Sequence, residues 1–255
     1  MLAQLSTQSI SGDQAGSGLR VARRAAFSLI EMLVVIGIIA LLTTLALPAI
    51  KGLGKSNNND SATRQVMDDL ALARQKALIE RTTVYMLFVP PAVNSTNLAS
   101  GQFTAYALYS KRSVGAQPGQ NNPRFFTEWR QLPDGVFFAT NKFDPAASAR
   151  NSTDPYLRSL PIQDDKFFGY VRNSPDDSLD NFRYLAFTPQ GQLLSGKDEI
   201  ITLAHGSIFY KRLNGFPQRN SFPDVIETEK LKGSRQNIRI NWLTGRARVE
   251  KVELQ

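Results

Sequence analysis

The sequence contains no cysteine and only one histidine, His205. The lack of cysteine excludes disulfides, thiolate metal ligands and a cysteine nucleophile. A single histidine excludes histidine-rich metal sites and leaves one candidate imidazole base, which we expect at a hairpin turn between Ala204 and Gly206. No G-x-S-x-G elbow and no phosphate-binding loop is present, so we predict that the protein is not an enzyme.

Neither sign of charge is extreme, because 30 Lys+Arg stand against 22 Asp+Glu, a net charge of +8. With 42% hydrophobic and 20% charged residues the composition is that of a globular protein, which excludes global disorder. The positive charge permits an anionic partner, but by itself it indicates only solubility and non-specific attraction. A length of 255 residues allows one large or two small domains.

Apolar residues are concentrated at residues 27–47, which contain one charged residue, Glu31. About 20 apolar residues in a helix are enough to cross a bilayer. The preceding Arg20, Arg23 and Arg24 should keep that end cytoplasmic. We therefore expect a single pass through the inner membrane, with most of the chain outside the cytoplasm.

Two conventional readings of this segment compete with a more specific one. A secretory signal peptide has a shorter apolar run and a small-residue cleavage site, and both features are missing here. A plain signal anchor fits the length and the charge but leaves Glu31 unexplained. An ionisable group inside a membrane helix costs on the order of 2.5–3.5 kcal/mol and usually has a partner.

The sequence RRAAFSLIE at residues 23–31, followed by the apolar run, resembles the prepilin N-terminus of type IV pilins and type II secretion pseudopilins. The resemblance implies that prepilin peptidase cuts between Ala26 and Phe27 and methylates the new amine of Phe27. It also implies that Glu31 pairs with the N-terminal amine of a neighbouring subunit. Pro48 corresponds to the family's helix proline, which can kink a helix. Ala26 stands where the family usually has glycine, so we expect slower processing.

The same resemblance implies the partners and the domain organisation. The partners are other pilin or pseudopilin subunits, prepilin peptidase, an inner-membrane assembly platform and membrane lipid, and the assembled state is a periplasmic or surface filament. The expected parts are a basic leader (1–26), a transmembrane assembly helix (27–50), an amphipathic helix (51–81) and a β-rich head (82–255) with a loop insertion near 144–180.

Glycine and asparagine are dense at residues 51–60, which predicts a bend or a frayed segment. Helical periodicity then resumes over residues 62–81. Its apolar positions recur at spacings of four, three and four, at Val66, Leu70, Ala73 and Ala77. We therefore expect an amphipathic helix lying on a sheet.

Strand patterns dominate the rest of the chain. They lie at residues 83–89, 103–110, 135–139, 182–187, 200–203, 207–211, 236–242 and 246–252. Residues 189–191 and 243–245 separate strands as turns. The predicted fold class is α+β and pilin-like, with a long N-terminal helix packed on one antiparallel β layer.

The later half also resembles minor pseudopilins of the GspH/FimT type. The resemblance is carried by FTPQG at residues 187–191 and by residues 238–249, which include Thr244, Gly245 and Arg246. It implies a structural minor subunit of a type II secretion pseudopilus or a type IV pilus.

Two candidate binding sites remain as alternatives. Arg246 and Arg248 alternate along one strand and share a face. This pattern resembles one used by DNA-uptake minor pilins, while the alternative is a charged strand that protects a sheet edge. Asp176, Asp177 and Asp180 offer oxygen ligands for Ca²⁺, although their spacing matches no EF-hand and the alternative is a solvated turn.

Overall fold

The computed structural model describes residues 28–93, 98–112, 123–162, 182–218, 220–228 and 235–250, without the side chains of residues 45–57. The chain divides into two compact units, Met1–Ala49 and Ile50–Gln255. Helix α1, Leu29–Glu80, belongs to both, and the sheets belong to the second unit, here called the head.

The bend expected at residues 51–60 is wrong, because α1 is helical throughout that stretch. Glycine and asparagine disfavour a helix by up to about 1 kcal/mol per residue, but tertiary contacts outweigh such preferences. One such contact joins this stretch to the head, where Asn58 Nδ2 donates a hydrogen bond to the carbonyl of Asp134 at 3.0 Å. Pro48 also lies inside α1.

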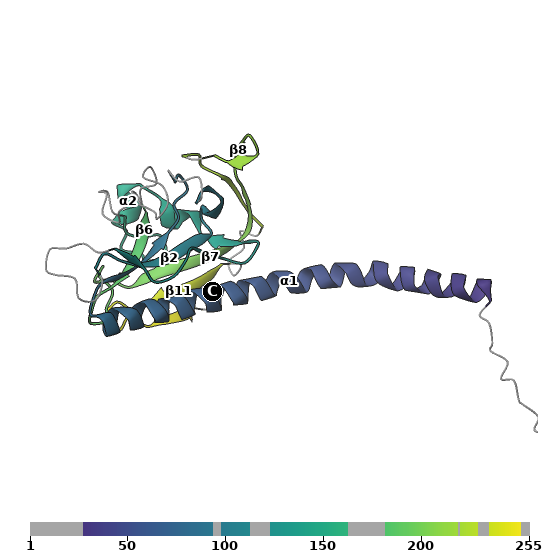
Figure 1. Cartoon of the computed structure of the whole chain (residues 1–255), viewed down its shortest axis with the longest axis horizontal. Coiled ribbons are helices and arrows are strands. Elements are labelled where there is room, and N and C mark those ends of the chain that lie inside the picture. Colours follow the sequence, from purple (N-terminus) through teal and green to yellow (C-terminus); the bar gives the residue numbers. More distant parts are fainter. Residues whose placement is uncertain are drawn as a thin grey trace, which may run out of the picture. The chain divides into compact units, whose positions relative to one another are not determined.

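The amphipathic part of α1 is confirmed, since its expected apolar positions are all buried. These positions, with the preceding alanine, are Ala62, Val66, Leu70, Ala73 and Ala77. They join side chains of both sheets in one hydrophobic cluster. Figure 1 shows the C-terminal part of α1 running beside the sheets.

The head contains two antiparallel sheets rather than the single β layer that the strand pattern predicted. The first has the order β3 (Arg124–Phe125), β2 (Ala105–Ser110), β1 (Val84–Phe88), β6 (Arg183–Phe187), with β4 (Arg130–Gln131) also on β2. The second has the order β10 (Asp224–Glu227), β7 (Glu199–Phe209), β11 (Gln236–Ile240), β12 (Ala247–Glu250), with β5 (Val136–Phe138) also on β7. A separate hairpin joins β8 (Arg212–Leu213) to β9 (Phe216–Pro217), and the short helix α2 is Ala147–Arg150.

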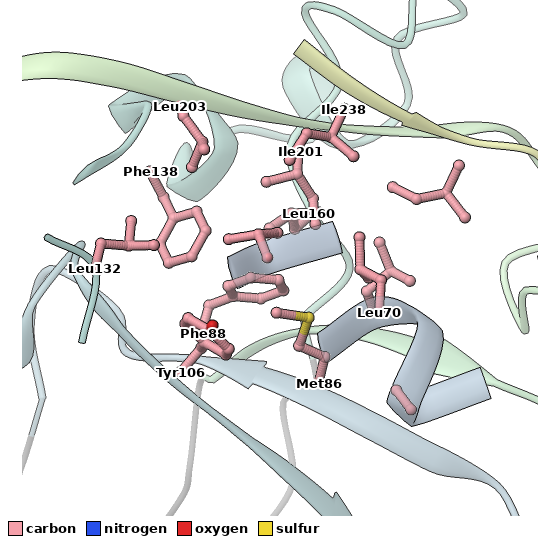
Figure 2. Packing of buried hydrophobic residues seen from close by; sticks show 14 of the residues in the cluster. Leu70, Met86, Phe88, Tyr106, Leu132, Phe138, Leu160, Ile201, Leu203 and Ile238 are labelled. Atoms are coloured by element: carbon pink, nitrogen blue, oxygen red, sulfur yellow. The ribbon is translucent and has the colours of Figure 1, made fainter. Parts of the chain in front are cut away.

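The main core lies between the two sheets and α1, as Figure 2 shows. Alternate residues of β1 point into it, including Met86 and Phe88. The ring of Phe88 meets that of Phe138 edge to face, with centroids 4.9 Å apart. The α+β, pilin-like fold class is confirmed by this arrangement of a helix on antiparallel sheets.

A polar clamp also fixes α1 to the first sheet. The buried Tyr106 donates its hydroxyl hydrogen to Asp69 on α1 at 2.6 Å, and Arg130 of β4 pairs with the same carboxylate. Gln65 donates to the oxygen of Tyr106 at 3.0 Å. Burial, and secondly the bond to Asp69, raise the pKa of Tyr106.

His205 lies inside β7, so its expected position at a hairpin turn is wrong. The two strands expected at 200–203 and 207–211 are one strand of 11 residues. Gly206 is the reason, because a Cβ there would lie 2.1 Å from the carbonyl oxygen of Ile226. The glycine permits close pairing with β10 instead of a reversal of the chain.

The first part of the expected insertion is built into the head. Leu160 is buried in the core, and the Nζ of the buried Lys142 donates to the carbonyl oxygens of Pro155, Tyr156 and Arg158 at 2.9–3.1 Å. Burial lowers the pKa of Lys142 to about 8. The remaining residues of the insertion, 163–180, lie outside the described part of the chain.

The opposite face of the first sheet carries an aromatic cluster. Tyr85 and Tyr109 are buried there, and their rings meet those of Tyr184 and Phe125 at centroid distances of 5.6 and 5.1 Å. Burial raises the pKa of both Tyr85 and Tyr109 from 10.0 to about 12. The folded protein therefore keeps two phenolic protons that the unfolded chain has begun to release at pH 10.

We predict that the free energy of unfolding falls as the pH rises from about 10.5 to 12. In this range the unfolded state binds fewer protons than the folded state at Tyr85 and Tyr109, so each contributes a slope of up to about 1.4 kcal/mol per pH unit. Lys142 acts in the opposite sense, but only between its folded pKa of about 8 and its ordinary value of 10.5. Urea unfolding followed by phenolate absorbance measures the slope.

The matched variant is Tyr109→Phe, which removes one of the two phenols from the aromatic cluster. Its stability should depend less steeply on pH in the same window. An unchanged slope in this variant, or constant stability of the native protein up to pH 12, would contradict the burial argument.

Candidate functional site

The first turn of α1 is capped by Ser28. Its Oγ accepts a hydrogen bond from the backbone N–H of Glu31 at 3.2 Å, and its carbonyl accepts from the N–H of Met32 at 3.2 Å. Ser28 and Glu31 thus occupy the first and fourth positions of a capping box. The sequence analysis missed this role of Ser28, although the S-x-x-E spacing just before an apolar run was its signal.

The residues that follow Glu31 are apolar and exposed in every direction. All large side chains from Leu29 to Leu42 are exposed, and all of them are apolar except Glu31. The hydroxyls of Thr43 and Thr44 donate to the carbonyls of Ile39 and Leu41, both at 2.7 Å. The helix therefore satisfies both threonine hydroxyls itself, as an apolar environment requires.

Among the described residues, no helix has a stretch that is both long and apolar enough to cross a membrane. The structure does not describe Ala26 and Phe27. It also does not describe the side chains of residues 45–57, which include that of Pro48.

Residues 21–47 match the family model described as the prokaryotic N-terminal methylation motif. The matched segment is the prepilin-type motif of type IV pilins and pseudopilins, and it covers only the N-terminal part of this chain. No curated protein and no solved structure gives a match. A prepilin-type motif implies processing by prepilin peptidase, anchoring in the inner membrane and assembly with other pilins, and it is a feature of structural rather than enzymatic subunits.

The two turns that carry the resemblance to minor pseudopilins lie side by side in this pilin-like chain. Arg74 of α1 joins them, since its Nε donates to the carbonyl of Thr244 at 2.8 Å and to that of Gly191 at 3.3 Å. A further backbone bond of 2.8 Å runs from Leu193 to Trp242. Two short motifs that are distant in sequence thus form one contact with the helix.

Both glycines of this contact are required by the backbone. Gly191 and Gly245 have φ angles of +78° and +62°, which side chains disfavour. A Cβ on Gly245 would lie 2.1 Å from the carbonyl oxygen of Gly191 and 3.0 Å from Cδ of Arg74. The two turns therefore approach each other more closely than any other residue type at 245 allows.

Arg246 and Arg248 are exposed beside and on β12, an edge strand of the second sheet. In the described part of the chain neither has an acidic partner. Arg248 stands opposite Arg239 of β11, which is held by Glu250 at 3.2 Å and Asp198 at 3.7 Å. Arg246 and Arg248 are thus both exposed at this edge, whereas Arg239 is paired with two carboxylates.

The two remaining candidates are the proposed Ca²⁺ ligands and His205. Asp176, Asp177 and Asp180, the residues considered for Ca²⁺, lie outside the described residues. Within the described ranges there is no group of three or more His, Asp or Glu side chains that could hold a metal ion. Both ring nitrogens of His205 are buried without a hydrogen-bond partner in those ranges.

We predict that Gly245→Ala destabilises the head more than Gly196→Ala does. Gly196 has a nearly equal φ of +65°, but nothing lies within 4 Å of a Cβ there. Gly196→Ala therefore reports the backbone strain alone, about 1–3 kcal/mol, whereas Gly245→Ala adds the clash with Gly191. Midpoints of urea unfolding compare the two variants, and equal losses would show that the contact between the turns adds nothing.

Proposed function

We propose that this protein is a structural minor subunit, of the GspH/FimT type, in a type II secretion pseudopilus or type IV pilus. Prepilin peptidase cuts it between Ala26 and Phe27, and it assembles through its N-terminal helix. The observation that carries this proposal is the match to the methylation motif over residues 21–47, which contains both the cleavage junction and Glu31.

Glu31 is the assembly residue in this proposal. It is exposed within a helical segment whose other large side chains are apolar and exposed, so packing in lipid or in a filament core surrounds its carboxylate with apolar groups. A charge in such surroundings requires a partner. The amine of Phe27 on a neighbouring subunit supplies it after cleavage, because cleavage creates a cation close to this turn.

The head supports the minor-subunit part of the proposal. The FTPQG turn and the Thr244–Gly245 turn, which carry the resemblance to the GspH/FimT type, are fixed to one side of α1 by Arg74. This contact couples the end of the second sheet to the assembly helix within the head.

The type II secretion pseudopilus and the type IV pilus can be distinguished by the neighbouring genes, which encode either secretion components or pilus components.

We predict that Glu31→Gln is processed normally but fails to enter filaments. Glutamine can still serve as the fourth residue of the capping box, so the variant removes the charge and keeps the helix start. N-terminal mass spectrometry should find residue 27 as a methylated first residue in both proteins. Crosslinking to partner subunits in sheared filaments measures assembly, with an expected loss of at least tenfold.

Ser28→Ala is the control, because it removes the cap oxygen and keeps the carboxylate. It should assemble much better than Glu31→Gln. Normal assembly of Glu31→Gln would contradict the ion pair, and an intact Met1 or a cut beyond residue 47 in the native protein would contradict the whole proposal.

DNA binding is a second candidate function, favoured by one observation, the exposure of Arg246 and Arg248 without acidic partners in the described residues. If it holds, the detergent-solubilised chain retards duplex DNA at low salt and releases it as salt rises. Arg246→Ala with Arg248→Ala should abolish the retardation. Arg212→Ala is the control for loss of an exposed arginine elsewhere, and equal effects would mean non-specific attraction.

A further inference from the structure

The second sheet extends into a long arm, formed by residues 207–218 and 220–226. The distal half of β7 pairs with β10, with Phe209 opposite Asp224, and the chain then continues into the hairpin of β8 and β9. The hairpin closes through Asn214 and Gly215, whose φ angles of +52° and +84° fit a type I′ turn. Figure 1 shows β8 standing away from the sheets of the head.

The side chains of the arm are unusual for a surface hairpin. Five large apolar residues are more than half exposed, namely Phe209, Leu213, Phe216, Phe222 and Ile226. Lys211 and Arg212 are exposed among them, and no acidic residue occurs between Ser207 and Pro223. Leu213 and Phe216 are directly opposite each other at the tip. The tip therefore combines an apolar pair with positive charge.

The base of the arm is held in place by several contacts. The N–H of Asn220 donates to the carbonyl of Val93 at 3.0 Å, and Gln102 Nε2 donates to the carbonyl of Ser221 at 3.0 Å. These contacts fix the base of the arm. The apolar side chains at the tip therefore remain exposed and are not buried against the head.

The residue before the arm is linked to α1 within the head by two hydrogen bonds. The N–H of Gly206, the residue before the arm, donates to the carbonyl of Gly135 at 2.9 Å, and the adjacent Asp134 accepts the bond from Asn58. Asn58 is only eleven residues after Leu47, the last residue of the methylation-motif match. The start of the arm is therefore linked, through Asp134 and Gly135, to the part of α1 that lies within the head.

We propose that the arm binds the surface of a lipid bilayer that carries anionic headgroups. Leu213 and Phe216 enter the interface between headgroups and acyl chains, and Lys211 and Arg212 contact the phosphates. A two-stranded tip is too narrow to bury the roughly 800 Å² per partner of a stable protein interface. Anchoring through the N-terminal segment makes the encounter of the arm with the bilayer intramolecular, so a few such contacts suffice; this inference rests on that anchoring.

A site-directed spin label tests the proposal in the full-length chain. The sequence has no cysteine, so Phe216→Cys provides a unique position for a nitroxide. The labelled chain is reconstituted into vesicles of phosphatidylcholine, with or without phosphatidylglycerol. With phosphatidylglycerol, collisions of the label with lipid-soluble oxygen should rise several-fold and those with a water-soluble nickel chelate should fall. High salt should reverse the change.

Leu157→Cys is the matched control, because Leu157 is exposed to a similar extent, 63% against 69% for Phe216, and lies outside the arm. Its label should remain accessible to nickel in both vesicles. Lys211→Glu with Arg212→Glu should return the label at position 216 to water.

A label at 216 that stays accessible to nickel in a chain that floats with the vesicles would overturn the inference and leave the proposed function intact. A label shielded from both reagents would also overturn it, because protein rather than lipid would then cover the arm. Failure of the unlabelled chain to float would overturn the membrane anchoring, and with it both the proposed function and the arm's role.

Discussion

The head depends on the packing of one face of α1 between two sheets. Ala62, Val66, Leu70, Ala73 and Ala77 close the core with small or aliphatic side chains, which allow the sheets to approach the helix closely. The same helix begins as a segment that is apolar on all sides. A single helix therefore meets two different constraints along its length, a stripe facing a core and an all-round surface for lipid or neighbouring helices.

Polar contacts determine how this helix is positioned, because apolar packing alone is not directional. Asp69 holds Tyr106 and Arg130 on the first sheet, and Arg74 holds the turns at Gly191 and Thr244, which adjoin the second. Removing Asp69 leaves the buried hydroxyl of Tyr106 without its acceptor, which costs about 1–3 kcal/mol. Two polar contacts on successive turns thus specify both the rotation of the helix and its position along the sheets.

The sequence was most informative where local periodicity coincides with burial. The stripe of α1 and six strands (β1, β2, β5, β6, β11 and β12) were predicted to within one or two residues, since alternation and helical spacing are local properties. The short strands β3, β4, β8 and β9, and β10, were not predicted. The continuous strand through His205 was missed because Gly206 was interpreted as a turn residue, whereas its role depends on β10, which is 18 residues away. The second sheet and the contact at Arg74 were missed for the same reason, since both require pairings between residues distant in sequence. Of the candidate sites, the grouping of Arg246 with Arg248 remains a prediction from strand alternation, and the pairing of Arg239 with Asp198 and Glu250 was not predictable from the sequence.

The buried cations near residues 142–160 show how the head orders a region with few apolar residues. Lys142 and Arg183 donate mainly to backbone carbonyls, and Glu199, near Arg158, is the one buried carboxylate described in this cluster. Carbonyl dipoles stabilise the cations, and the cations in turn satisfy carbonyls that have no place in either sheet. This arrangement makes the path of the loop depend on a few long side chains rather than on its own sequence. Surface residues of the loop can therefore change without loss of the core, which suits a region available for contacts with other subunits.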